Sequence, residues 1–421
     1  MTEPYYQDEY VTLHHGDCRD VLATLPDASV DAVVTDPPYE LAFMGKGWDS
    51  SGIAFDVAMW AEVLRVLKPG GHLLAFGGTR TFHRVTVAIE DAGFEVRDCM
   101  SWLYGSGFPK SLDVSKAIDK AAGAEREVVG FDASKARPNK TRHAKAMDGV
   151  GYHRDEVSGV QDNGATITAP ATADAERWQG WGTALKPAHE PICLARKPLV
   201  GTVAANVLEH GTGALNIDGC RIGTEGGGTK CTHRDAAGTC LGHPTANGSL
   251  GGGIMRHAAD GASGRWPANV VLDEDAAAML DVQSGTLTSG RMAAGTAPKG
   301  GRMTYGQDAA SGYVTTNDTP GDSGGASRFF YVAKAPASER PKVDGKAHAT
   351  VKPLTLMRWL VRLVTPPGGH VLDPFAGSGT TAEACIVEGF TCTLIEKDAD
   401  HLPLITERLA KPIQPTMFGA S

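Results

Sequence analysis

Strand-like and helix-like segments alternate along residues 10–104 and 328–410, and this alternation constrains the fold more than any other feature. In the first stretch, the buried-strand patterns SVDAVVT and HLLAFGG flank VAMWAEVLRVL, whose apolar residues recur at helical spacing. In the second, HVLDPF and FTCTLIEKD predict strands, while PLTLMRWLVRLV and AEACIVEG predict helices. Such alternation predicts a mainly parallel sheet that helices cover on both faces.

Between these stretches the pattern gives way to polar, glycine-rich sequence, interrupted by the strand-like PICLARK. A structureless loop of that length is implausible inside a compact domain, so we expect an inserted domain. The expected divisions are residues 1–120 and 328–411 as two halves of one ordered domain, 121–180 as a basic, flexible insertion, 181–199 as a core strand segment, 200–327 as a second insertion and 412–421 as a tail.

Composition narrows the class of protein. The 421 residues carry a net charge of −9, which argues against a surface coated in nucleic-acid-binding charge but permits a local basic groove. The eight cysteines are scattered, so we expect reduced thiols. The first residues do not resemble a signal peptide, and no apolar run reaches the roughly 18 residues of a membrane span. A soluble cytoplasmic protein without a membrane partner is expected.

The segment HVLDPFAGSGTTAEA places a Gly-x-Gly turn, Gly377 and Gly379, between a strand and a helix. Such glycines let a ligand approach the backbone at a helix N-terminus. No lysine follows the last glycine, which excludes a P-loop, and Ala382 interrupts the dinucleotide fingerprint.

Two acidic residues near this loop indicate the charge of the ligand. Asp373 ends the strand before the loop, where it would repel a phosphate but favour a cationic amine or sulfonium. Glu396 ends the next strand, the usual place for a carboxylate that binds ribose hydroxyls. A ligand with a ribose, a positive charge and no phosphate fits S-adenosylmethionine.

A second unusual feature is VVTDPPYE at residues 33–40, where an apolar strand ends in two prolines. The two prolines fix φ at two successive residues and remove two backbone N–H groups, so this stretch cannot continue a central strand of a sheet. The alternative to a functional motif is a simple structural turn that ends the strand.

With DPPY at 36–39 and DPFAGSG at 373–379, the chain resembles the permuted, beta-class DNA amino methyltransferases. RVLKPGGHLLAF and HATVKPLTLMRWL extend the resemblance, which covers roughly residues 10–120 and 328–410. It implies a Rossmann-like, doubly wound, mainly parallel seven-stranded sheet, circularly permuted, with a large inserted target-recognition region at 200–327. The permutation implies that the last helix leads back to the strand near Val11, so the chain ends should lie close together.

The resemblance assigns catalysis to Asp36, Pro37, Pro38 and Tyr39. The exocyclic amine of adenine or cytosine is a poor nucleophile, and acceptors on Asp36 and the Pro37 carbonyl would draw density onto its nitrogen. Tyr39 would stack on a base swung out of the duplex. The product proton would pass to water or to Asp36.

The residues that the resemblance and the loop assign to the cofactor are Asp17, His348, Lys352, Asp373, Pro374, Phe375, Gly377, Ser378, Gly379, Thr380 and Glu396. Asp17 has an alternative as a helix N-cap. Phe375 has an alternative as ordinary core, and His348 and Lys352 as solvated polar residues. Ala349 departs from the family pattern, which usually has proline there, so the turn should lose some rigidity.

Double-stranded DNA is the expected partner, and the basic run at 134–145 is the best candidate for phosphate contacts, with a solvated loop as the alternative. Guanine edges could be read by one of four arginines, namely Arg221, Arg256, Arg265 and Arg291. Residues 40–49 are a candidate lid. Zinc is an alternative for the cluster of Cys220, Cys231, His233, Cys240 and His243. The cluster lacks paired zinc-ligand spacing, so we expect ordinary loop cysteines and no metal.

The sequence therefore predicts methyl transfer from S-adenosylmethionine to the N6 amine of adenine in double-stranded DNA. Cytosine N4 is the alternative within the class, RNA is a less favoured substrate, and a non-catalytic DNA-binding module is the alternative outside it. A homodimer and a separately encoded restriction endonuclease are further candidate partners, in a bacterial or phage setting.

Overall fold

The computed structural model describes residues 3–41, 51–107, 111–132, 166–223, 264–288, 322–333, 342–343, 346–347 and 351–411. These residues form two compact units. The larger unit comprises Met1–Ser106 and Ala188–Ser421, and the smaller comprises Gly107–Pro187. None of the described helices is long and apolar enough to cross a membrane.

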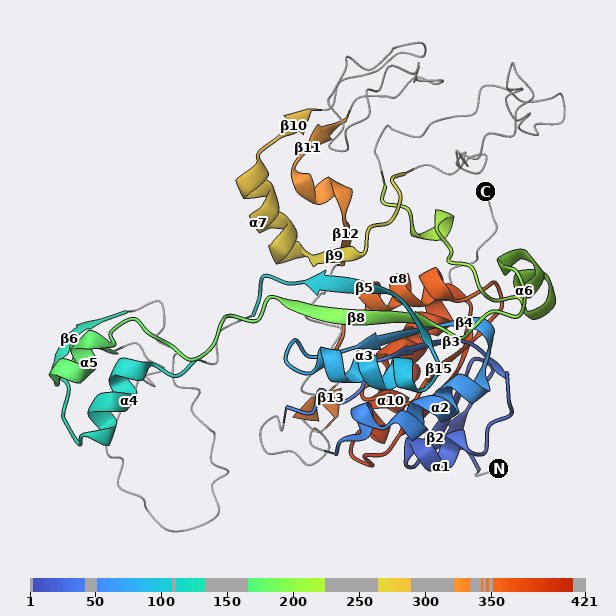
Figure 1. Ribbon diagram of the computed structural model, residues 1–421, viewed down its shortest axis with the longest axis horizontal. Helices are drawn as coiled ribbons and strands as arrows, with labels where there is room; N and C mark the ends of the chain where they lie inside the picture. The colour runs from blue at the N-terminus through green and yellow to red at the C-terminus, as the bar shows by residue number, and fades with distance from the viewer. Residues whose placement is uncertain are drawn as a thin grey trace, which may run out of the picture. The chain divides into compact units, whose positions relative to one another are not determined.

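The larger unit is built on a ten-stranded sheet (Figure 1). In spatial order its strands are β1 (Tyr6–Gln7), β2 (Val11–His15), β16 (Thr391–Glu396), β15 (His370–Asp373), β3 (Val30–Thr35), β4 (Leu67–Phe76), β8 (His189–Arg196), β5 (Glu95–Leu103), β9 (Val270–Asp273) and β12 (Tyr331–Ala333). Most neighbours are parallel, whereas β1 runs antiparallel to β2 and β8 runs antiparallel to both β4 and β5.

The mainly parallel α/β architecture is as expected, but the strand count is a correction. Seven contiguous strands from β2 to β5 are extended by β1 at one edge and by β9 and β12 at the other. Strand β9 is only four residues long and lies within glycine-rich sequence, so its signal was too short to be recognised as a strand.

Helices cover both faces of the sheet. One face carries α1 (Cys18–Leu22), α2 (Val57–Val66) and α3 (Phe82–Asp91), and the other carries α8 (Leu354–Val364), α9 (Thr380–Glu388) and α10 (Leu402–Leu409). Alternation along β3 sends Val33 into the first core and Val34 into the second. The sheet is therefore doubly wound, as the sequence pattern predicted.

The first and last parts of the chain meet in this sheet. Strand β2 pairs in parallel with β16, with Leu13 opposite Leu394. The Gly16 N–H continues the contact by donating to the Glu396 carbonyl at 3.0 Å. This pairing agrees with the expected circular order, in which the last strand and helix lead back to the strand near Val11.

Parts of the expected insertion at 200–327 belong to the larger unit. Strand β9 pairs with β5. Helix α6 (Val203–His210) is anchored to the start of β4 through Asn206, whose amide donates to the Pro69 carbonyl at 2.9 Å. The remaining elements of this region are η4 (Asp218–Cys220), α7 (Glu274–Ser284), β10 (Leu287–Thr288), β11 (Ser323–Gly324) and η5 (Ala326–Phe329). The described parts of 200–327 are therefore continuous with the central sheet and not a separate unit.

The smaller unit begins earlier than the insertion expected at 121–180. It contains α4 (Val114–Ala121), α5 (Ala173–Arg177) and an antiparallel pair, β6 (Val128–Phe131) with β7 (Thr166–Thr168). Asp119 on α4 holds it together, because its fully buried carboxylate accepts from Arg126 at 2.5 Å and from the Thr172 hydroxyl at 2.7 Å. A short hairpin of β13 (Lys342–Val343) and β14 (Lys346–Ala347) belongs to the larger unit.

Candidate functional site

The two motifs of the sequence meet at the carboxyl ends of neighbouring parallel strands. Strand β3 ends at Thr35, immediately before the DPPY turn, and its neighbour β15 ends at Asp373, immediately before the glycine loop. The Thr35 hydroxyl donates to Asp373 Oδ1 at 2.7 Å and joins the two strand ends. In a doubly wound sheet, the carboxyl edge is where ligands bind.

The two oxygens of Asp36 have different environments. Oδ2 accepts a hydrogen bond from the Lys352 ammonium at 2.5 Å. Oδ1 is buried and has no hydrogen-bond partner among the residues that the structure describes. A buried acceptor without a partner is uncommon in native proteins and needs an explanation, for which a ligand donor is one candidate.

Tyr39 is held at both its backbone and its phenol. The Thr81 hydroxyl donates to the Tyr39 carbonyl at 2.7 Å, and the Tyr39 hydroxyl donates to Glu190 Oε2 at 2.8 Å. Burial, followed by the nearby charges of Asp36 and Glu190, raises the pKa of Tyr39 well above its ordinary value. The phenol therefore stays protonated and acts as a fixed donor to Glu190.

Lys352 lies at the centre of this polar cluster. Its ammonium is 2.5 Å from Asp36 Oδ2, 3.3 Å from Glu190 Oε2 and 3.1 Å from the Tyr39 hydroxyl. It also lies 4.8 Å from the centre of the Phe76 ring, within cation–π range. Burial lowers the pKa of Lys352, but Asp36 and Glu190 more than offset that effect, so the pKa lies above its ordinary value.

Sequence reasoning missed Glu190, which is the second acid of this cluster. It lies at the start of β8, 151 residues from Tyr39 in the chain, and belongs to neither motif. The one available signal was its place as an acid directly before the buried strand PICLAR.

Asp373 has the predicted position, but both of its oxygens are occupied within the protein. Oδ1 accepts from Thr35 and from the Phe375 N–H at 3.1 Å, and Oδ2 accepts from the Thr381 hydroxyl at 2.5 Å. Burial raises the pKa of Asp373 to about 6, against the lowering effect of these hydrogen bonds. Asp373 thus ties β3, β15 and α9 together. Pro374 follows it, and the half-buried Phe375 packs against the core on the α1–α3 face.

The glycine loop adopts the conformation for which glycine is suited. Gly377 and Gly379 have φ of +53° and +74°, in the left-handed region. A Cβ added to Gly379 would lie 3.0 Å from Ile405 Cγ2 on α10. The hydroxyls of Ser378 and Thr380 lie 3.2 Å apart and form a hydrogen bond with each other, and their contact with a cofactor stays a prediction.

Glu396 at the end of β16 is bonded to the glycine loop. Its Oε2 accepts from the Gly377 N–H at 2.7 Å, and its Oε1 accepts from the Asp398 N–H at 2.7 Å. His401 Nδ1 lies 3.4 Å from the same Oε1. The three strand ends β16, β15 and β3 therefore present Glu396, the loop and Asp36 along one edge of the sheet.

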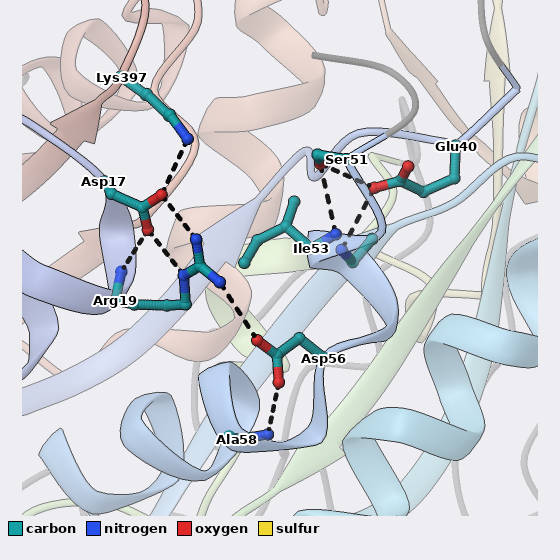
Figure 2. A network of polar contacts seen from close by, with 9 residues as sticks. Asp17, Arg19, Glu40, Ser51, Ile53, Asp56, Ala58 and Lys397 are labelled. Atoms are coloured by element: carbon teal, nitrogen blue, oxygen red, sulfur yellow. Dashed lines mark hydrogen bonds and ion pairs between the residues drawn. The ribbon is translucent and has the colours of Figure 1, made fainter. Parts of the chain in front are cut away.

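Asp17 caps helix α1 and joins it to the segment after β16 (Figure 2). Its carboxylate accepts from the Arg19 backbone and guanidinium at 3.0–3.1 Å and from Lys397 Nζ at 2.9 Å. Arg19 also lies 3.9 Å from Asp56, the N-cap of α2. These bonds, with that to Arg19 the largest cause, hold the pKa of Asp17 well below its usual range. The N-cap alternative is confirmed, and contact with the cofactor stays a prediction.

Glu40, which follows the DPPY turn, has φ of +55° and reaches the start of the next described segment. Its carboxylate accepts from the Gly52 N–H at 2.8 Å. It also accepts from the Ser51 hydroxyl at 3.2 Å (Figure 2). Apart from Glu40 and Leu41, the candidate lid at 40–49 lies outside the described residues.

Several predicted residues lie outside the described part of the chain. They are His348, Ala349, the basic run 134–145, Arg256, Arg291, Cys231, His233, Cys240 and His243. Cys220 is buried, with its thiol 3.7 Å from the Trp359 carbonyl. No group of potential metal ligands occurs among the described residues.

The two described arginines among the candidate base readers are paired within the protein. Arg221 lies 2.8 Å from Asp218, and Arg265 forms an ion pair with Asp322. Neither guanidinium is a bare charge, so a role in reading guanine would require exchange of these partners.

The fold and the site define a doubly wound α/β protein with a DPPY turn and a glycine loop on adjacent strand ends. The chain matches the family model of N6/N4 DNA methylases over residues 30–198 and 312–407, which together make up more than half of its length. The protein belongs to this DNA methylase family.

Individual relatives match shorter parts of the chain. The type II methyltransferase M.HindIII of Haemophilus influenzae is 29% identical over 164 residues, which cover 38% of each protein. The type II methyltransferase M2.LlaDCHI of Lactococcus lactis subsp. cremoris is 28% identical over 122 residues, 24% of this chain and 45% of the relative. The matches thus span less than half of these relatives.

Among solved structures, the PvuII DNA methyltransferase (cytosine-N4-specific) aligns over 97% of this chain and 90% of its own, with 13% identity and a TM-score of 0.45. A TM-score of this size does not establish a common fold.

Proposed function

We propose that the protein transfers a methyl group from S-adenosylmethionine to the exocyclic N6 amine of adenine in double-stranded DNA. The observation that carries this proposal is Asp36 Oδ1, a buried acceptor that lacks a partner among the described residues and lies at the end of β3, beside the glycine loop. Family membership supports the same activity.

The chemistry requires two acceptors aimed at one amine. Asp36 Oδ1 supplies one, and the Pro37 carbonyl, which the two prolines fix in direction, supplies the other. Hydrogen bonds to both N–H groups draw electron density onto the nitrogen and expose its lone pair. The protein thus accelerates transfer by positioning and electrostatics.

The residues at the strand ends fit the proposed cofactor. S-adenosylmethionine supplies the methyl group as the electrophilic carbon of a sulfonium. The left-handed glycines Gly377 and Gly379 leave the backbone open to close approach by a ligand. Glu396 and Asp17 place carboxylates at the ends of β16 and β2, where ribose and adenine contacts are expected. Phe375 offers an aromatic face that is only half-buried.

Duplex DNA as substrate requires that the target base leaves the stack, because its amine cannot otherwise reach the strand ends. Tyr39, whose carbonyl and hydroxyl are both fixed, is the candidate stacking partner. Cytosine N4 remains the alternative base, since the two acceptors would serve its amine equally well. A homodimer, a separately encoded endonuclease and a bacterial or phage setting remain proposals.

The test is transfer by the purified full chain. The protein would be incubated with S-adenosylmethionine that carries a deuterated methyl group and with unmethylated bacterial DNA, and the digested nucleosides would be identified by mass spectrometry. We expect labelled N6-methyladenine from the unaltered chain and from Asp20→Asn, an exposed carboxylate on α1. We expect at least a 100-fold loss in Asp36→Ala. Labelled N4-methylcytosine would change the base, and no labelled nucleoside would refute the proposal.

A further inference from the structure

The cluster around Lys352 brings together residues that are remote in sequence. Asp36 and Tyr39 come from the turn after β3, Glu190 from the start of β8, and Lys352 from the residues before α8. The lysine is 316 residues from Asp36 in the chain. Three segments that are remote in sequence therefore converge on one ammonium, which makes this cluster a built site.

The ammonium of Lys352 has three donors, and three acceptors surround it. They are Asp36 Oδ2 at 2.5 Å, the Tyr39 hydroxyl at 3.1 Å and Glu190 Oε2 at 3.3 Å. Its charge also faces the rings of Phe76 and Tyr39, at 4.8 and 5.3 Å from their centres. In this arrangement, no donor of Lys352 remains for the methionine end of a cofactor.

We propose that Lys352 and Glu190 are positioning residues that fix Asp36 and Tyr39 for the target base, an inference that rests on the proposed methyl transfer. Lys352 occupies Asp36 Oδ2 and so leaves Oδ1 as the acceptor for the amine. Glu190 anchors both the phenol that would stack on the base and the ammonium that orients Asp36.

Charge balance supports this role. Asp36 and Glu190 are two carboxylates that share one cation, and Lys352 is only 7% exposed. Without the lysine, two anions would face each other in a largely buried site, which disfavours their present arrangement. Asp36 would then be free to turn either oxygen toward the base or away from it.

The positioning role of Lys352 can be distinguished by experiment from the cofactor contact that the sequence resemblance implied for it. A positioning lysine affects turnover and base placement, whereas a cofactor ligand affects affinity for S-adenosylmethionine. The discriminating experiment measures the dissociation constant of S-adenosylmethionine by calorimetry, kcat and KM for DNA, and the fluorescence of 2-aminopurine placed at the target position. The variants are Lys352→Met, Lys352→Arg and Glu190→Gln in the full chain.

A matched control is Lys68→Met. Lys68 Nζ donates to Asp31 Oδ1 at 2.5 Å, the same length as the Lys352–Asp36 contact, but this pair links β4 to β3 away from the DPPY turn. Its loss should lower stability and leave kcat and 2-aminopurine fluorescence unchanged.

For Lys352→Met we expect kcat to fall about 100-fold, the scale of a misplacement of roughly 1 Å at a reacting centre, with the cofactor dissociation constant within about twofold of that of the unaltered chain. Lys352→Arg keeps the charge and should recover part of kcat. Glu190→Gln keeps an acceptor for Tyr39 but loses the charge, so we expect a smaller loss, together with a change in 2-aminopurine fluorescence.

A cofactor dissociation constant that rises tenfold or more in Lys352→Met, with kcat unchanged, would overturn the positioning role in favour of cofactor binding. Unchanged kinetics in Glu190→Gln would overturn the role of Glu190, and this result stands even where Lys352→Met fails to fold. No methyl incorporation by the unaltered chain would instead refute the proposed function, and with it the inference.

Discussion

Replacement of Asp373 by asparagine should remove one identifiable part of the dependence of the protein's stability on pH. The carboxylate is 2% exposed, and its partners suit an amide equally well. The asparagine oxygen can accept from Thr35 and from the Phe375 N–H, as Oδ1 does, while its NH₂ group donates to the Thr381 hydroxyl, which can also accept. The substitution therefore removes the titration of Asp373 with little change in packing.

The magnitude follows from the pKa of the folded state. Burial raises the pKa of Asp373 from 3.8 to about 6, and each unit corresponds to about 1.4 kcal/mol, so the full effect is roughly 3 kcal/mol. Between pH 4 and 6 the folded state holds a proton that the unfolded state has lost. The contribution of Asp373 to stability therefore falls as pH rises through this window and is constant above it.

The assay is chemical denaturation of the full chain at several pH values between 4 and 7.5. The difference in the free energy of unfolding, Asp373→Asn minus unaltered chain, should increase by up to about 3 kcal/mol between pH 4 and 7. Asp20→Asn, an exposed acid on α1, controls for the loss of one negative charge. Parallel stability curves for Asp373→Asn and the unaltered chain would refute the reasoning.

Three further results are expected. Glu388→Gln should lower the free energy of unfolding by about 3 kcal/mol, because the buried Glu388 carboxylate accepts from two arginines of α8 at 2.6–2.7 Å. Chemical denaturation measures this loss against the exposed Glu407→Gln as control, and equal stabilities of the two variants would contradict it. Gly379→Ala should lower the free energy of unfolding by about 1–2 kcal/mol, because φ of Gly379 is +74° and the added Cβ would lie close to Ile405. The same change should weaken S-adenosylmethionine binding, and an unchanged affinity in calorimetric titration would count against the loop as the cofactor site. His72→Gln should lessen the loss of stability as pH falls from 6.5 to 4. Burial, followed by the charge of Arg196, lowers the pKa of His72 in the folded state to about 4, so the unfolded state binds the proton first and is favoured as pH falls. The same loss of stability in His72→Gln and in the unaltered chain, measured by denaturation, would exclude this.

The meeting of the two motifs was predictable from the sequence, because Asp36 and Asp373 each follow a buried strand and parallel strands present their carboxyl ends at one edge. The neighbour relation of β2 and β16 was predictable for a related reason, since a cyclic order of strands and helices closes the sheet only there. These features depend on local pattern and on topology, both of which the chain encodes in short segments.

The internal partners of the site residues were not predictable. Glu190 reaches Tyr39 only because β8 runs antiparallel between β4 and β5, a pairing that no local pattern encodes. The threonines that occupy Asp373 are ordinary in sequence, and their role depends on side-chain directions at two strand ends. Strand β9 was missed because four residues in glycine-rich sequence carry too little periodicity.

The most direct test of the central claim is modification-sensitive long-read sequencing of DNA from a methylation-free bacterial host that expresses the full chain, with Asp36→Ala as the control. We expect N6-methyladenine confined to one sequence motif in cells with the unaltered chain and absent with Asp36→Ala. Identical, unmodified DNA from both strains, with soluble protein that binds S-adenosylmethionine, would contradict a DNA methyltransferase and direct attention to RNA or to a non-catalytic role.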